Sequence, residues 1–111
     1  MIANLESSIA ARLQASPSQI AEFCDRWKIT EMWLFGSVLR EDFRPDSDID
    51  FLVTFAPSPG WSLFDLMDME EELKSMCERD VDIANKKGLK NPYRRREILG
   101  TCRSIYSAEL T

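Results

Sequence analysis

Apolar residues recur every three or four positions in the first part of the chain, which is the spacing of amphipathic helices. The first stripe consists of Ile2, Leu5, Ile9 and Leu13. It predicts a helix within residues 1–15, with Arg12 on the side that faces water. Ser16 fits the cap of a second helix, because Pro17 suits a first helical position and Gln19 completes the spacing of a capping box. The apolar stripe of this second helix is Ile20, Phe23, Cys24 and Trp27.

Three later segments have the composition or the alternation of β-strands. Residues 29–35 are rich in β-branched and aromatic side chains and end at a glycine, Gly36. Residues 48–55 alternate: one face has Ile49, Phe51, Val53 and Phe55, and the other has Asp48, Asp50, Leu52 and Thr54. Residues 80–84 alternate in the same way, with Val81 and Ile83 opposite to Asp80 and Asp82. We therefore expect three strands, and the state of the last segment, around Ile105, stays open.

The segments between these strands differ in character. Residues 38–47 contain many charges and few apolar side chains, which predicts a short helical turn followed by an exposed loop. Ser62 can cap a further helix that ends near Arg79. Its expected apolar positions are Leu63, Leu66, Met69, Leu73 and Met76, and its expected acidic face includes Asp65, Asp68, Glu71 and Glu72. Trp61 and Phe64 fit either core packing or an exposed docking surface for a partner.

Composition sets limits on size and location. The 111 residues and 12.8 kDa correspond to one domain over residues 1–111. The chain lacks an apolar run long enough to span a bilayer and lacks an apolar signal core at its start, so we expect a cytoplasmic protein with no membrane partner. The net charge of −5 opposes broad attraction to a phosphate backbone, so direct nucleic-acid binding is not expected.

The chain contains no histidine, and this restricts its chemistry. Ser-His-Asp and Cys-His nucleophile systems and histidine-ligated zinc are excluded. The three cysteines, Cys24, Cys77 and Cys102, are widely spaced and are expected to be reduced and buried. Catalysis by this chain must therefore use carboxylates.

Asp48 and Asp50 are the strongest candidates for such chemistry. They lie two positions apart in a strand, so both carboxylates share one face and repel each other. Oxygen ligands at this density suit Mg²⁺, and Asp82 on a separate strand offers a third carboxylate. Asp80 has the same parity as Asp82 and is the alternative ligand, while alternating acids at a solvent-facing strand edge are the alternative to any metal site. Three such aspartates are typical metal ligands of enzymes that use two metal ions for phosphoryl or nucleotidyl transfer.

Gly36 and Ser37 lie where a strand meets a helical turn. Glycine allows close backbone approach there, and the exposed N–H groups and the hydroxyl can hold phosphate oxygens. Arg40, about one helical turn further on, can reach the same phosphates. A glycine–serine pair alone means little, but it gains weight from the aspartate pair that follows the loop.

These motifs resemble those of the minimal nucleotidyltransferases of the DNA polymerase β superfamily. The resemblance consists of Gly36-Ser37-Val38-Leu39-Arg40, then Ser47-Asp48-Ile49-Asp50-Phe51-Leu52-Val53, then Val81-Asp82-Ile83. It implies an α/β nucleotidyltransferase fold whose mixed, mostly antiparallel sheet has helices packed against it. It also implies that Gly36, Ser37, Arg40 and Ser47 bind ATP, and that Asp48, Asp50 and Asp82 are catalytic residues that bind two Mg²⁺ ions. Many members have a glycine after the arginine, whereas Glu41 stands there in this chain.

The small size is similar to that of the antitoxins of HEPN-MNT toxin–antitoxin modules. That resemblance implies a cognate HEPN-type ribonuclease as the partner and transfer of AMP from ATP to one of its tyrosines. Two alternatives stay open: a nucleotidyltransferase that modifies a small hydroxylated compound, and a catalytically idle antitoxin that acts by binding alone. Whether Asp82 is a general base or only a metal ligand also stays open. The basic residues of 86–96 could steer a triphosphate, but a solvated face is the commoner use of such a run, and we expect that use here.

Overall fold

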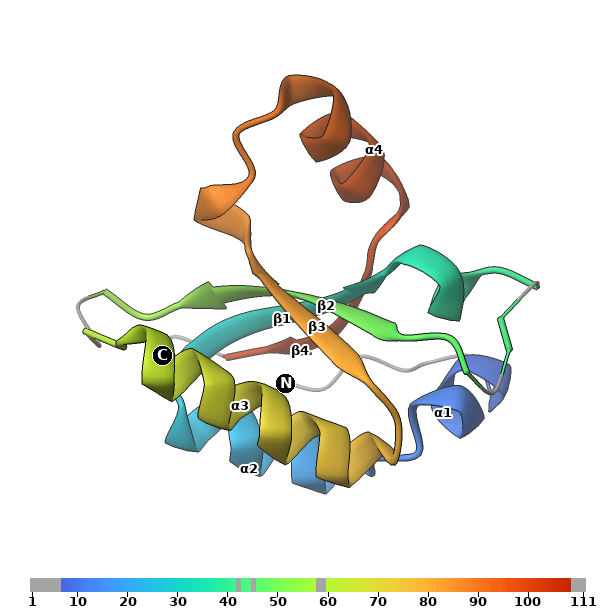
Figure 1. The fold of residues 1–111 in the computed structure, drawn as a ribbon, viewed down its shortest axis with the longest axis horizontal. Helices are drawn as coiled ribbons and strands as arrows, with labels where there is room; N and C mark the ends of the chain where they lie inside the picture. The colour runs from blue at the N-terminus through green and yellow to red at the C-terminus, as the bar shows by residue number, and fades with distance from the viewer. Residues whose placement is uncertain (1–6, 42, 45, 58–59, 109–111) are drawn as a thin grey trace.

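A four-stranded sheet in the order β3-β2-β1-β4 forms the centre of the computed structural model, which describes residues 7–41, 43–44, 46–57 and 60–108 (Figure 1). In chain order the elements are α1 (Ser7–Leu13), α2 (Pro17–Arg26), β1 (Ile29–Phe35), the 3₁₀ turn η1 (Gly36–Leu39), β2 (Ile49–Phe55), α3 (Leu63–Cys77), β3 (Val81–Asn85), the 3₁₀ turn η2 (Lys86–Gly88), α4 (Pro92–Thr101) and β4 (Arg103–Ser107). β1 pairs antiparallel with β2 and β4, and β2 pairs parallel with β3. The expected α/β class and the mixed, mostly antiparallel sheet are confirmed.

The two N-terminal helices follow the sequence pattern. Ile2 and Leu5 of the expected first stripe lie outside the described residues, and α1 is described from Ser7. The cap of α2 is the expected capping box: the Gln19 amide donates to Ser16 Oγ at 3.1 Å, and the Ser16 amide donates to Gln19 Oε1 at 2.8 Å. Because the local sequence satisfies the helix terminus by itself, the start of α2 could be read from four residues.

The sheet buries apolar side chains on both faces. α1, α2 and α3 cover one face, and α4 stands over the other (Figure 1). In β2, Ile49, Phe51 and Val53 lie in the main core under α1–α3, whereas Leu52 packs with Phe35 and Ile98 beneath α4. Asp50 and Leu52 share a strand face, so Asp50 lies on the α4 side.

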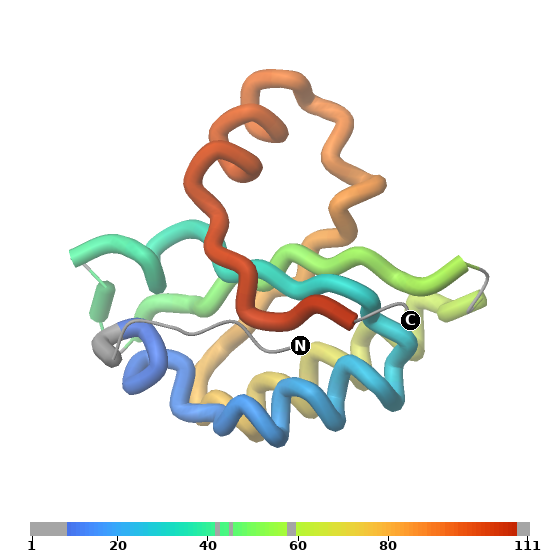
Figure 2. The backbone as a smooth tube through the Cα atoms, turned by 180° about the vertical axis from the view of Figure 1, so that it is seen from behind, coloured from blue at the N-terminus to red at the C-terminus, as the bar shows by residue number. Residues whose placement is uncertain are grey.

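The segment from η2 to α4 forms an arch that rises from the sheet and returns through β4, as the rear view shows (Figure 2). β4, whose state the sequence left open, runs antiparallel beside β1. The three cysteines are free; Cys24 and Cys77 are buried as expected, but Cys102 is only half-buried. No described helix has the length and apolar character needed to cross a membrane.

The expected apolar stripe of α3 is wrong at one position. Met69 and Leu73 are buried and Leu66 and Met76 pack against the core, but Leu63 is 71% exposed. At 3.6 residues per turn Leu63 lies about 120° around the helix from Met69. It therefore points away from the sheet, as Phe64 does at 76% exposure. Of the two aromatics with an open role, Trp61 packs on the core and Phe64 does not.

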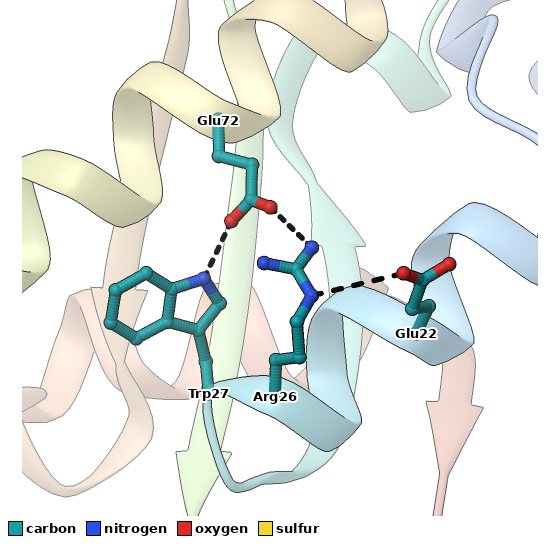
Figure 3. A network of polar contacts seen from close by, with 4 residues as sticks. All are labelled: Glu22, Arg26, Trp27 and Glu72. Carbon is teal, nitrogen blue, oxygen red and sulfur yellow. Dashed lines mark hydrogen bonds and ion pairs between the residues drawn. The ribbon is translucent and has the colours of Figure 1, made fainter.

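Glu72 is not part of a solvated acidic face, contrary to the expectation. It lies about 60° from Met69, at the border of the buried face. There its Oε2 accepts a hydrogen bond from Trp27 Nε1 at 2.6 Å and its Oε1 pairs with Arg26 (Figure 3). Trp61 Nε1 donates to the Trp27 carbonyl at 2.9 Å. These contacts connect α2 to α3 on the face of the sheet that α1, α2 and α3 cover.

Candidate active site

One row of residues crosses three strands at the edge where β1 ends. Phe35 of β1 is the register partner of Asp50 in β2, and Asp50 is the register partner of Asp82 in β3. Residues paired in adjacent strands point to the same face, so Asp50 and Asp82 both lie on the α4 side. Asp80, the alternative to Asp82, pairs instead with Lys74 Nζ at 3.0 Å. The structure thus brings Asp82, and not Asp80, beside Asp50.

The turn that follows β1 packs directly against this row. Gly36 has a φ of +76°, a conformation that L side chains rarely adopt. A Cβ built at Gly36 would overlap Oδ2 of Asp50 and lie 3.3 Å from its Cγ. Glycine is therefore required twice, for the backbone conformation and for the space that the Asp50 carboxylate fills.

Ser37 and Arg40 lie on the same turn. The Ser37 hydroxyl donates to the main-chain carbonyl of Asp48 at 3.3 Å, which joins the turn to the start of β2. The Arg40 amide donates to the Ser37 carbonyl at 2.9 Å, and the Arg40 side chain is exposed. Gly36 thus contacts the Asp50 carboxylate, and the charges of Asp48 and Arg40 act on the same group.

A cavity of about 490 Å³ opens between η1 and α4. Gly36 and Arg40 line it on one side and Arg94 on the other, with Arg103 of β4 also in its wall. Three arginines and one carboxylate, Glu97, are its charged groups among the described residues. The volume lies within the range of sites for small ligands, and the charge favours an anion.

The pKa of the Asp50 carboxylate is shifted by its surroundings in the site. Its partial burial raises its pKa above the ordinary value for an aspartate, and the charges of Asp82 and Asp48 raise the pKa further. Arg94 and Arg40 oppose this shift by lowering the pKa of the same group. Asp50 is therefore an anion that needs positive charge nearby, which a bound cation would supply.

The chemistry of the donors fits Mg²⁺. Asp48, Asp50 and Asp82 offer hard carboxylate oxygens, and the repulsion on Asp50 is what a divalent ion would relieve. Within the described ranges, no three acidic or thiol side chains gather at the spacing of metal ligands. Carboxylates converge when a cation outweighs their repulsion, so the assignment of these three residues as ligands stays a prediction.

Two arginines that sequence reasoning missed hold the loop between η1 and β2. Arg12, expected on the wet side of the first helix, is half-buried and donates to the carbonyls of Val38 at 2.9 Å and Arg40 at 2.7 Å. Arg79 donates to the carbonyls of Arg44 and Ser47 at 3.0 and 3.1 Å. Both guanidinium groups lie over the Phe43 ring, at 5.3 Å for Arg12 and 4.4 Å for Arg79. No local signal marks these contacts, because they join segments far apart in the sequence.

Ser47 does not line the cavity beside Gly36. Its hydroxyl accepts a hydrogen bond from the Arg44 amide at 3.1 Å, and it borders a different cavity together with Lys74 and Asp80. These contacts shape the turn before Asp48, and a direct role of Ser47 in ATP binding stays a prediction.

The basic segment is not a uniformly solvated face, so that expectation is wrong in part. Lys86 Nζ lies 4.8 Å from the centre of the Trp33 ring, and Arg95 donates to the Lys86 carbonyl at 3.1 Å. Arg94 borders the cavity beside Gly36. The arch of Figure 2 folds this segment back over the sheet, which a charge count along the sequence does not reveal.

Comparison with known proteins gives a consistent result. Residues 17–105 match the family described as the nucleotidyltransferase domain, and this range includes every residue of the site above except Arg12. The protein adenylyltransferase MntA of Thermococcus cleftensis is 36% identical over 70 residues, which cover 63% of this chain and 69% of that protein.

Two solved structures share the fold. One, described as a candidate minimal nucleotidyltransferase, is 31% identical with a TM-score of 0.64, covering 78% of this chain and 86% of its own. The other is a chain of the complex between a tri-AMPylated Shewanella oneidensis HEPN toxin and its MNT antitoxin. Its TM-score is 0.60 at 17% identity, covering 83% of this chain and 70% of its own, so it supports the fold alone.

Proposed function

The chain belongs to the nucleotidyltransferase domain family, and from this premise we propose that it transfers AMP from ATP to a tyrosine hydroxyl of a HEPN-type ribonuclease and thereby neutralises it. One observation carries the proposal: the register neighbours Asp50 and Asp82 lie beside a glycine turn that opens into an arginine-lined cavity. A carboxylate row next to a cationic cavity suits a substrate with both a triphosphate and metal ions.

The chain's own residues divide the work by position. Gly36 brings the backbone of the turn against Asp50, and Arg40 lines the cavity that would hold the phosphates. Ser37 lies on the same turn, where its hydroxyl donates to the Asp48 carbonyl, and it would bind a phosphate oxygen from there. Asp48, Asp50 and Asp82 would hold two Mg²⁺ ions. Bound there, Mg²⁺ neutralises charge on the phosphates and lowers the pKa of the attacking hydroxyl.

The reaction balances without any further reactant. The acceptor oxygen forms a bond to the α-phosphorus of ATP, the bond between that phosphorus and the bridging oxygen breaks, and pyrophosphate leaves. The acceptor loses one proton. Asp82, which is exposed in the edge strand β3, would assist this loss either as a general base or as a ligand of the metal that lowers the pKa of the hydroxyl.

The shape of the site favours a protein acceptor. Asp82 is exposed and lies in the edge strand β3, so the acceptor side of the carboxylate row is open to a large partner. A tyrosine of another protein projects far enough to reach a recessed carboxylate row, and its partner brings the rest of the binding surface. In the Shewanella complex a HEPN toxin is AMPylated and bound to an MNT antitoxin of this fold, and we propose the same pairing for this chain.

The test is to incubate the purified chain with Mg²⁺, ATP labelled on the α-phosphate and the HEPN-type ribonuclease encoded beside it. We expect label on a tyrosine of the ribonuclease, located by mass spectrometry, together with loss of RNase activity. ATP labelled on the γ-phosphate should leave the ribonuclease unlabelled, because that phosphate departs with pyrophosphate.

A matched pair of variants separates the site from general charge effects. Asp50→Asn should abolish labelling, whereas Asp80→Asn, which removes a carboxylate paired with Lys74, should retain it. An inhibited but unlabelled ribonuclease would refute transfer and favour an antitoxin that acts by binding alone. Labelling of small hydroxylated compounds but not of the ribonuclease would refute the protein acceptor.

A further inference from the structure

Three consecutive arginines on α4, Arg94, Arg95 and Arg96, have three different surroundings. Arg95 holds the arch together by donating to the carbonyl of Lys86 at 3.1 Å, with the Leu89 carbonyl at 3.5 Å. Arg96 is exposed and is not among the residues that line the cavity beside Gly36. Arg94 is exposed as well, but it lines that cavity. Of these three neighbouring arginines, Arg95 thus holds the arch together, Arg96 faces solvent and Arg94 borders the site.

Arg94 and Arg40 border the cavity from two different elements of the fold. Arg40 and Gly36 come from the turn after β1, and Arg94 comes from the helix that covers the other side of the cavity. The positive charges of Arg94 and Arg40 both act on the Asp50 carboxylate, so both guanidinium groups lie close enough to interact with it electrostatically. Among the described residues that line the cavity, three guanidinium groups face one carboxylate, Glu97, and this excess of positive charge favours an anionic ligand.

A polyphosphate is the anion that suits this arrangement. The phosphorus that is attacked must lie near the aspartate row, so the remaining two phosphates extend away from it into the cavity. Guanidinium groups bind phosphate oxygens with two parallel hydrogen bonds, and they stabilise the charge that develops on a departing pyrophosphate.

We propose that Arg94 binds the β- and γ-phosphates of the nucleotide from the α4 wall, opposite Arg40, so that α4 is part of the nucleotide site. This inference rests on the proposed function, because it takes the ligand of the cavity to be ATP. It assigns to one arginine of the basic segment a role that the charge run by itself does not indicate. Arg94 acts on the leaving group, and the aspartate row acts on the phosphorus that is transferred.

The test compares the binding of ATP and of AMP, each with Mg²⁺, to the wild-type chain and to Arg94→Ala by calorimetry. We expect Arg94→Ala to weaken ATP binding about tenfold and to change AMP binding by less than about twofold, because AMP lacks the two phosphates that Arg94 contacts. Arg96→Ala removes the same charge from the same helix and should leave both affinities at the wild-type level. Arg94→Lys should recover part of the ATP affinity, since it restores the charge but not the paired hydrogen bonds.

Three outcomes would overturn the assignment. Arg94→Ala binding ATP as tightly as the wild type would exclude the contact, and equal losses for ATP and AMP would indicate a structural role. An equal loss in Arg96→Ala would indicate a general effect of helix charge. Failure of the wild-type chain to bind ATP with Mg²⁺ would instead overturn the proposed function and this inference together. Far-UV circular dichroism of each variant verifies the fold, and Arg94→Gln replaces Arg94→Ala if the latter unfolds.

Discussion

Replacing Gly36 by alanine tests the connection between the glycine turn and the carboxylate row. The added methyl group would overlap Oδ2 of Asp50, and the φ of +76° is unfavourable for alanine. To reach ordinary van der Waals contact, the Asp50 carboxylate must move by about 1 Å or the turn must open. Gly36→Ala therefore perturbs the site at its centre without removing any functional group.

The two consequences differ in size. A non-glycine residue held in a left-handed conformation costs about 1–3 kcal/mol of folding stability, which corresponds to roughly 10 °C in Tm for a domain of this size. A displacement of about 1 Å at a reacting centre can lower the rate about 100-fold. We therefore expect kcat/KM for AMP transfer to fall by about two orders of magnitude at a temperature where the variant is still folded.

The assay combines thermal unfolding with initial rates of AMP transfer. Gly100→Ala is the matched control, because a Cβ at Gly100 meets no atom within 4 Å and the position lies in α4. Alanine is the better helix former, so this control should keep its activity and gain about 0.5–1 kcal/mol in stability. If Gly36→Ala retained wild-type kcat/KM, the position of the Asp50 carboxylate would not matter for transfer and the reasoning would be refuted.

The double substitution Asp48→Asn and Asp50→Asn should abolish transfer, and chelation of divalent ions should do the same. The Tm of the double variant should stay level or rise, because two repelling anions are removed. Residual turnover of the double variant would contradict the metal assignment. Arg12→Ala should raise KM for ATP several-fold and lower stability by about 1–2 kcal/mol, because the anchors on two carbonyls of the turn are lost; an unchanged KM would show that the turn keeps its shape without Arg12. Glu72→Gln should destabilise the fold by about 1 kcal/mol at neutral pH, since it weakens hydrogen bonds to a carboxylate. Burial alone would raise the pKa of Glu72, but hydrogen bonds from Arg26 and Trp27 outweigh it and lower the pKa below the ordinary glutamate value. The stabilisation is therefore complete above that ordinary value and is lost as the pH falls through the lowered pKa, so urea titrations of wild type and Glu72→Gln should converge in acid.

Local sequence determined the elements whose signals are complete within a few residues. The capping box of Ser16 and Gln19 satisfies the start of α2 by itself, so the helix could be predicted there. Alternation in residues 48–55 sorted Asp50 and Phe51 onto opposite faces, because the side-chain period of a strand is two. Gly36 could likewise be recognised as a turn residue from its position after a strand. The α/β fold and most of the candidate site follow from such signals together with the family motifs.

Only the tertiary structure decided which distant groups meet. Asp80 and Asp82 have the same parity, so alternation could not choose between them. The family motif favoured Asp82, and the register of β3 against β2 places Asp82 beside Asp50. The angular position of Glu72 on α3 let it reach Trp27, where a count of acidic residues predicted solvent. Arg12 and Arg94 became site residues because α1 and the arch fold back onto the turn after β1. The sequence around a charged side chain does not identify its partner, because the energy of the contact depends on a distance that only the folded chain sets.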